Sequence, residues 1–179
     1  MTAPVRRVVV TGSECTGKTT LADRLGRQYG APVVPEFARA YAARKGAAIG
    51  VDDHWPIVRG QVTAEAEALA RPLAAARSLI VLDTDLLSTV AYAQHYTGQC
   101  DPDIEALARE RIADHYLLLD IDVPWTADGI RDRGDRREAL HALFIETLER
   151  FGAPYTLVRG SFDERLFLAQ RATDAVLTR

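Results

Sequence analysis

The sequence has few cysteines and no long apolar run. Its cysteines, Cys15 and Cys100, cannot build a disulfide framework and do not have the spacing of metal ligands. No apolar stretch approaches the roughly 18 residues of a membrane-spanning helix. The apolar run that follows Arg6 and Arg7 is too short for the apolar segment of a signal peptide. We therefore expect a cytoplasmic protein with no membrane partner.

An excess of positive charge is also absent. The formal net charge of -3 argues against a general nucleic-acid binder, so we expect no nucleic-acid partner. The 179 residues are 47% hydrophobic and 26% charged, which is ordinary for a globular protein with a sizeable core. The chain has no repeats, low-complexity tracts or linkers, which predicts a single domain over residues 1–179. The sequence does not indicate an oligomeric state.

A phosphate-binding loop follows the first apolar run. Gly12 and Gly17 bracket four residues and precede Lys18 and Thr19, which is the pattern G-x-x-x-x-G-K-[ST]. The two glycines let the backbone curl so that N–H groups point at a phosphate, which Lys18 also reaches. A β-branched run precedes the loop and helical spacing follows it, as this motif requires. The pattern predicts a nucleoside triphosphate site made by Gly12, Ser13, Glu14, Cys15, Thr16, Gly17, Lys18, Thr19 and Thr20.

The rest of the chain alternates between short apolar runs and helical patterns. Strands are predicted at residues 5–11, 31–34, 79–82, 116–120 and 155–158. A long helix is predicted from an N-cap at Asp52 to Ala76, with a kink or an end near Arg71 because Pro72 follows. This alternation predicts an α/β fold, a five-stranded parallel sheet with helices on both faces.

Two acidic residues follow the third predicted strand. Ligands of parallel sheets lie beyond the carboxyl ends of the strands, which is where Asp83 and Asp85 fall. Asp83 is placed like the carboxylate that holds Mg²⁺ in phosphate-loop proteins, together with Thr19. The alternative is that Asp83 caps the next helix. Asp85 fits a substrate contact and a helix cap equally well.

Glu36 and Arg39 follow the second predicted strand. A carboxylate at this place can orient a substrate hydroxyl or accept its proton, while a nearby arginine keeps it ionised or contacts phosphate. The alternative is a surface ion pair between residues three apart on a helix. The sequence alone leaves both open.

An arginine-rich segment follows the fourth predicted strand. Arg131, Arg133, Arg136 and Arg137 alternate with aspartates and glycines. Residues 124–137 therefore fit a lid that closes arginines over the phosphates. The alternative is a solvated surface helix with many ion pairs.

Aromatic residues gather between the second and fourth predicted strands. Tyr41, Trp55, Tyr92 and Tyr96 lie in predicted helical regions. Such rings can sandwich a planar substrate, and Tyr41 and Tyr92 are the candidates for this contact. Packing in the core is the alternative for each ring.

Four of these segments together resemble the nicotinamide riboside kinase domain of NadR-type proteins. They are Gly-Ser-Glu-Cys-Thr-Gly-Lys-Thr-Thr-Leu at 12–21, Val-Pro-Glu-Phe-Ala-Arg at 34–39, Asp-Thr-Asp at 83–85 and Gly-Ser-Phe-Asp-Glu-Arg at 160–165. The resemblance implies a phosphate-loop kinase fold with a lid. It also implies transfer of the γ-phosphate of ATP, with Mg²⁺, to the ribose 5′-hydroxyl of nicotinamide riboside, which gives nicotinamide mononucleotide.

The resemblance also implies roles for individual residues. Lys18, Glu36, Asp83, Arg131 and Arg136 are then the catalytic candidates, with Glu36 activating the 5′-hydroxyl. Besides the phosphate loop, Arg133, Ser161 and Asp163 are expected to contact the nucleotide. Thr19 and Asp83 are expected to bind Mg²⁺. Substrate contacts are expected from Glu36, Arg39, Tyr41, Asp85 and Tyr92.

The sequence departs from the family pattern at two points. Ser13 replaces the proline that is usual at this loop position, which we expect to be harmless. NadR-type proteins often carry an adenylyltransferase domain, but the sequence has no H-x-G-H motif and we expect no such second activity. Two alternatives remain open: a kinase for another nucleoside or nucleotide, and a regulatory phosphate-loop NTPase.

Overall fold

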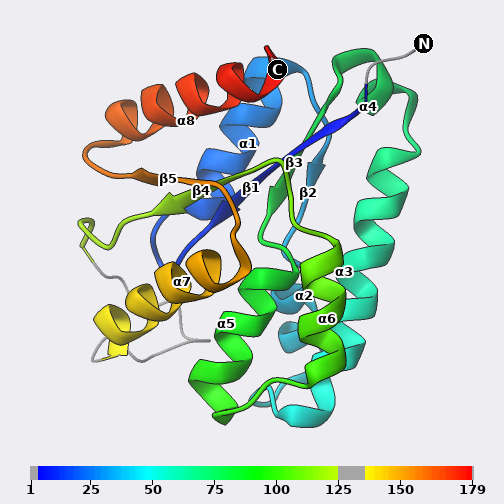
Figure 1. Ribbon diagram of the computed structural model, residues 1–179, viewed down its shortest axis with the longest axis vertical. Helices are drawn as coiled ribbons and strands as arrows, with labels where there is room; N and C mark the ends of the chain where they lie inside the picture. Colours follow the sequence, from blue (N-terminus) through cyan, green and yellow to red (C-terminus); the bar gives the residue numbers. More distant parts are fainter. Residues whose placement is uncertain (1–3, 125–135, 179) are drawn as a thin grey trace.

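The chain folds around one parallel sheet. The computed structural model describes residues 4–124 and 136–178 (Figure 1). Its sheet has the order β2-β3-β1-β4-β5, and every neighbouring pair is parallel. The predicted five-stranded α/β fold is therefore confirmed. The strands are β1 (Arg6–Thr11), β2 (Val33–Val34), β3 (Leu79–Asp83), β4 (His115–Leu119) and β5 (Tyr155–Val158).

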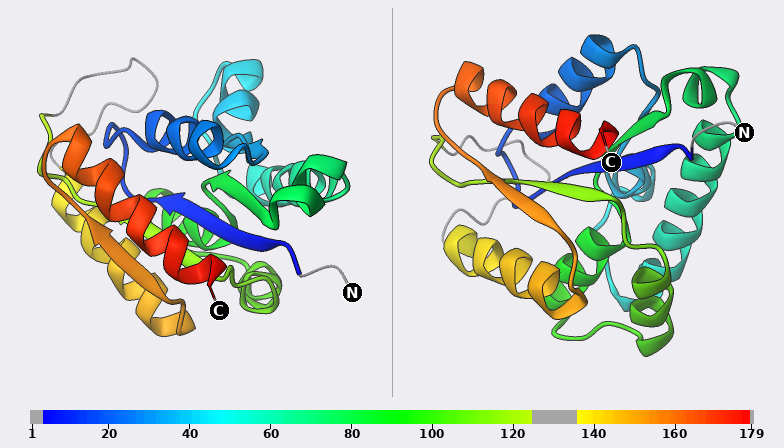
Figure 2. Two further views of the ribbon diagram at one scale, coloured as in Figure 1. Left: turned by 90° about the horizontal axis from the view of Figure 1, so that it is seen from above. Right: turned by 45° about the horizontal axis from the view of Figure 1, so that its top comes forward.

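Helices cover both faces of the sheet (Figure 2). Two of them, α1 and α8, pack on one face, and α3, α5, α6 and α7 lie toward the other. None of the helices in the described parts of the chain is both long and apolar enough to cross a membrane. The helical elements are α1 (Lys18–Tyr29), α2 (Phe37–Lys45), the 3-10 turn η1 (Val51–Asp53), α3 (His54–Leu69), α4 (Pro72–Arg77), α5 (Leu86–Thr97), α6 (Pro102–Glu110), α7 (Arg137–Phe151) and α8 (Phe162–Leu177).

The central strands are buried on both faces, which is why they are continuously apolar. In β1, Val8 and Val10 belong to the core under α1 and α8, whereas Val9 belongs to the core on the opposite face. All five residues of β3 are buried. A strand with no solvent-facing side cannot show the alternation of polar and apolar residues that marks exposed sheets.

The register of β1 and β3 positions the site. Val10 pairs with Asp83, so the loop that follows β1 lies beside the end of β3. On the other side of β1, Thr11 pairs with Leu118 of β4. The phosphate loop thus leaves the middle of the sheet at its carboxyl edge, where parallel sheets bind ligands.

Two predicted boundaries are corrected by local hydrogen bonds. The second strand starts at Val33 rather than at residue 31, because the N–H of Ala31 closes the end of α1 on Gly26 O (2.9 Å). The long helix does not start after an N-cap at Asp52, because residues 51–53 form a separate 3-10 turn. The predicted break at Pro72 is confirmed, and Pro72 opens α4.

Candidate functional site

The phosphate loop has the closed shape that its glycines require. Gly12 has φ +132°, and a Cβ there would lie 2.9 Å from Leu119 O, so only glycine fits. The hydroxyl of Thr16 and the amine of Lys18 both donate to Ser13 O, at 2.9 and 2.8 Å. These two bonds join the second half of the loop and the start of α1 to Ser13, and they hold the Lys18 amine against the loop.

The Asp83 carboxylate lies directly beside the start of α1. The Thr19 hydroxyl donates to Asp83 Oδ2 at 2.6 Å, while Asp83 Oδ1 is buried with no hydrogen-bond partner in the described residues. Burial raises the pKa of Asp83, although Thr19 and Lys18 oppose this shift. Carboxylate and hydroxyl oxygens of this kind suit a hard divalent cation such as Mg²⁺.

Glu36 lies near the same end of the sheet. It is buried at the N-terminus of α2, and the guanidinium of the exposed Arg39 contacts it at 3.5 Å. Its charge contributes to the raised pKa of Asp83, which means that the two carboxylates act on one another. The ion pair between Glu36 and Arg39, which was one of the two alternatives, is present, but its carboxylate is buried and not at the surface.

Gln61 ties the start of α2 to the end of β3. Its side-chain oxygen accepts from Phe37 N at 3.0 Å, and its side-chain nitrogen donates to Thr84 O at 3.4 Å. Phe37 follows Glu36 and Thr84 follows Asp83, so this buried glutamine fixes the distance between the two acidic positions.

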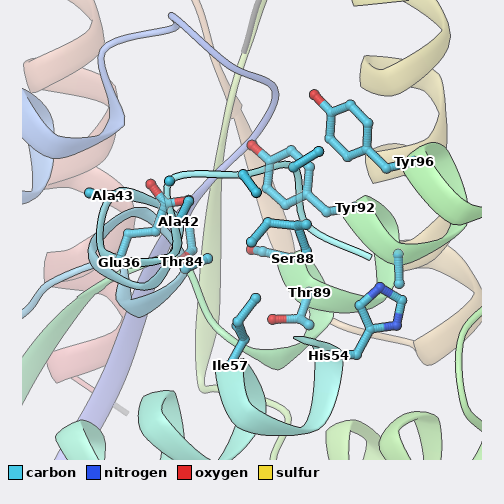
Figure 3. A pocket seen from close by; sticks show the side chains of 16 residues that line it. Glu36, Ala42, Ala43, His54, Ile57, Thr84, Ser88, Thr89, Tyr92 and Tyr96 are labelled. Carbon is cyan, nitrogen blue, oxygen red and sulfur yellow. The ribbon is translucent and has the colours of Figure 1, made fainter. Parts of the chain in front are cut away.

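A cavity of about 580 Å³ opens next to these carboxylates (Figure 3). It lies between α2, the start of α3, the end of β3 and α5, and most of the α2 side is lined by alanine. Its polar lining consists of Glu36, His54, Thr84, Ser88, Thr89, Tyr92 and Tyr96.

Two tyrosines of α5 connect this cavity to the phosphate loop. The Tyr92 hydroxyl donates to Gly12 O at 3.3 Å, and the Tyr96 hydroxyl donates to the Glu14 carboxylate. The rings of Tyr92 and Tyr96 are stacked, with centroids 6.1 Å apart. Tyr92 and Tyr41 were the two aromatic residues predicted to contact the substrate. Tyr92 lines the cavity, whereas Tyr41 does not, and the Tyr41 hydroxyl donates to Asp53 at 2.8 Å.

A second cavity of about 260 Å³ lies on the other side of the phosphate loop. Phe162 at the start of α8 forms part of its wall, and the Arg24 guanidinium lies 5.4 Å from the centre of the Phe162 ring. The loop residues that line this cavity are Cys15, Thr16, Gly17 and Thr20.

Arg165 holds the loop against the strands that follow it. The residue is only 4% exposed, and its guanidinium donates to Thr16 O at 2.8 Å and to Asp120 O at 3.1 Å. It also forms an ion pair with Asp122, and its Nε donates to Gly160 O at 3.0 Å. One buried arginine thus joins the phosphate loop, the end of β4 and the start of α8.

Several predicted contacts are placed elsewhere by the structure. The Asp85 carboxylate caps α5 by accepting from Ser88 N at 3.2 Å, and it accepts from the buried Tyr116 hydroxyl at 2.7 Å. This is the capping alternative, and Asp85 does not line either cavity. Ser161 likewise caps α8, and neither Ser161 nor Asp163 lines the smaller cavity.

The predicted lid falls mostly outside the described residues. Arg131 and Arg133 lie there, so their roles stay predictions. Arg136 is described, and it is exposed at the N-terminus of α7. The neighbouring Arg137 donates to Val123 O at 2.7 Å, which joins the two ends of this segment.

Five residues of the site were missed by sequence reasoning. Three of them carry no motif, because each is a polar residue inside a helical or loop pattern that is equally typical of a solvated surface. The segments that contain Thr84 and Arg165 were noted, but neither residue was given a role. The missed residues are His54, Gln61, Thr84, Ser88 and Arg165.

The sheet order, the phosphate loop and the adjoining cavities define a P-loop kinase fold. Residues 7–165 match the family described as an AAA domain, and the chain belongs to this family. It is 29% identical over 170 residues to the trifunctional NAD biosynthesis/regulator protein NadR of Salmonella typhimurium and 30% identical over 171 residues to that of Escherichia coli. These alignments cover 92% of this chain but 40% of each relative, so the chain spans well under half of their length.

Solved structures agree with this placement. A NadR protein in complex with NR is 28% identical and has a TM-score of 0.81, covering 96% of this chain and 50% of that one. A thymidylate kinase from Ehrlichia chaffeensis, 15% identical with a TM-score of 0.61 over 97% of this chain and 100% of its own, shares the fold. The resemblance to NadR-type proteins is therefore confirmed.

Proposed function

We propose that this chain is a kinase that transfers the γ-phosphoryl group of ATP to the ribose 5′-hydroxyl of nicotinamide riboside, which yields nicotinamide mononucleotide. The observation that carries the proposal is the cavity of about 580 Å³ that is lined by buried Glu36 and by Tyr92, whose hydroxyl donates to Gly12 O of the phosphate loop. The similarity to a NadR protein bound to NR supports this acceptor.

The phosphate loop and the smaller cavity form the proposed ATP site. Backbone N–H groups of residues 12–20 and the Lys18 amine receive the phosphates, and α1 presents its positive end to them. A NadR protein in complex with NAD and AMP-PNP, an ATP analogue, shares this fold at 23% identity and a TM-score of 0.81. Arg133, Ser161 and Asp163 remain proposed contacts of the nucleotide.

Thr19 and Asp83 would hold Mg²⁺. The buried Asp83 oxygen without a partner and the adjacent hydroxyl fit this ion. When bound, it would neutralise charge on the transferring phosphates.

The acceptor hydroxyl is proposed to lie at the Glu36 end of the cavity. Its oxygen bonds to the γ-phosphorus while the bond from that phosphorus to the bridging oxygen breaks, and ADP leaves. Glu36 accepts the proton of the hydroxyl. Arg39 and the lid residues Arg131 and Arg136 are proposed to stabilise the charge on the transferred group.

An acceptor screen tests this proposal against its rivals. ADP release from ATP is measured with nicotinamide riboside, thymidine, deoxyadenosine, a nucleoside monophosphate or no acceptor. We expect nicotinamide riboside to give the highest kcat/KM and ADP release to be slow without an acceptor. A faster reaction with another acceptor would contradict the substrate, and equal rates without any acceptor would favour a regulatory NTPase.

A further inference from the structure

A buried histidine lies at the end of the larger cavity that is remote from the carboxylates. His54 is the first residue of α3, is 4% exposed and lines the cavity. Figure 3 shows it on the opposite side of the cavity from Glu36. No hydrogen bond joins its ring nitrogens to another of the described residues, and neither nitrogen is among the fully buried polar atoms that lack a partner. The ring nitrogens therefore meet the open space of the cavity, where a ligand can reach them.

The imidazole of His54 is neutral at pH 7. Burial lowers its pKa below the ordinary value of 6.5, against the opposing charges of Asp53 and Asp101. A neutral imidazole has one donor and one acceptor nitrogen. A carboxamide also offers both a donor and an acceptor, so the two groups are complementary.

The charges around the cavity disfavour an anion at this end. No lysine or arginine is found among the described residues that line it, and Glu36 is its carboxylate. The three cations of α2 are engaged elsewhere: Arg39 contacts Glu36, Arg44 lies over the Phe37 ring, and Lys45 pairs with Asp53. A carboxylate buried here would lack a cation to compensate the loss of water, which is costly.

The other lining groups suit a cationic aromatic base. Tyr92 and Tyr96 place two aromatic rings along the wall of the cavity, above Ser88 and Thr89 in Figure 3. The faces of such rings attract cations, and N-ribosylated pyridine rings carry a positive charge. If the ribose hydroxyl lies at Glu36, the base extends toward His54.

We propose that His54 is the specificity-determining residue of the acceptor site, and that it selects a ribosylated pyridine with an uncharged amide over its carboxylate counterpart. This inference rests on the proposed function. It extends that function by predicting a preference for nicotinamide riboside over nicotinic acid riboside, which the sequence alone did not indicate.

The test compares kcat/KM for both ribosides in the wild type, in His54→Leu and in His54→Lys. We expect the wild type to favour nicotinamide riboside by at least about tenfold, because the site leaves a buried carboxylate uncompensated. His54→Leu should raise the KM for nicotinamide riboside by about tenfold and change the KM for ATP little. His54→Lys should shift the preference toward nicotinic acid riboside.

Controls separate this result from misfolding and from a wrong function. Glu67→Gln changes an exposed residue of the same helix and should keep the wild-type ratio. Thermal unfolding identifies variants that do not fold, and His54→Leu still decides the question if the lysine is not tolerated. If the wild type phosphorylates nicotinamide riboside but folded His54→Leu keeps the wild-type preference, the inference is overturned and the function stands. If the wild type phosphorylates neither riboside, the proposed function itself fails.

Discussion

Lys18 is the residue on which the nucleotide chemistry most depends. Its amine lies inside the loop, where it donates to Ser13 O at 2.8 Å. Lys18→Ala should lower kcat at least about 100-fold, because a preorganised charge on the transferring group is lost. Steady-state ADP release measures this effect.

The matched control for this substitution is Arg27→Ala, which removes an exposed cation from the same helix. It should leave kcat within about twofold of the wild type, as surface substitutions usually have small effects. The phosphate-loop assignment would be wrong if Lys18→Ala retained wild-type turnover while folded.

Glu36 is the proposed base, and its isosteric amide tests that role. Glu36→Gln keeps the volume of the side chain but cannot accept the proton, so kcat should fall by about 100- to 10,000-fold. The KM for ATP should stay nearly constant, because Glu36 lies in the acceptor cavity. Glu67→Gln, an exposed change in α3, is the control, and an unchanged kcat in Glu36→Gln would remove Glu36 from this role.

The role of a single residue could be predicted from the sequence only where its sequence pattern fits one local structure. The spacing of Gly12, Gly17 and Lys18 is dictated by backbone geometry around a phosphate, so the phosphate loop could be recognised from the sequence. A polar residue at the start of a helix is ambiguous, because it can cap the helix or bind a ligand. Asp85 and Ser161 turned out to be caps, whereas the cavity contact of His54 arises from tertiary packing that no local pattern records.

Among the elements, the packing of α2 on α3 decides where Glu36 lies. A Cβ on Gly60 of α3 would meet the Phe37 ring at 2.1 Å, so glycine allows this close approach. Phe37 is the residue after Glu36, and Gln61 fixes its backbone N–H. The contact between these helices therefore positions the proposed base.

Gly60→Ala should destabilise the protein by about 1–2 kcal/mol, because the added methyl group overlaps the ring. In a Phe37→Ala background the same substitution should instead stabilise it by about 0.5–1 kcal/mol, since alanine is the better helix former. Chemical denaturation of the four variants of this cycle measures the coupling. Equal effects in both backgrounds would show that the contact does not hold the helices.

The lengths of elements were less predictable than their existence. The apolar run at 79–82 marked its strand because burial on both faces demands it, and residues 155–158 matched β5. The start of β2 and the separate 3-10 turn at 51–53 were not predicted, because local backbone hydrogen bonds set these boundaries.

For the whole molecule, Asp85 links stability to pH. Burial raises its pKa from 3.8 to about 6. The folded state thus binds this proton more tightly than the unfolded state. The carboxyl group therefore costs stability at neutral pH, and this cost disappears as the pH falls through about 6 toward 4.

Asp85→Asn should remove this dependence, because its amide oxygen can still accept from Ser88 N while its NH2 group takes the place of Oδ2 and donates to the Tyr116 hydroxyl. The difference in unfolding free energy, variant minus wild type, should increase by about 1–3 kcal/mol between pH 4 and pH 7. Urea denaturation at several pH values measures it, and the titration of His54 cancels because both proteins share it. A difference that stays constant with pH would contradict the buried, ionisable state of Asp85.

The central claim joins the nucleotide site and the acceptor cavity in one reaction. It is tested most directly by incubating the protein with ATP, Mg²⁺ and nicotinamide riboside and measuring the products by mass spectrometry. The account predicts nicotinamide mononucleotide and ADP in equal amounts, and neither product above background with Lys18→Ala. ADP without any phosphorylated riboside would contradict the claim.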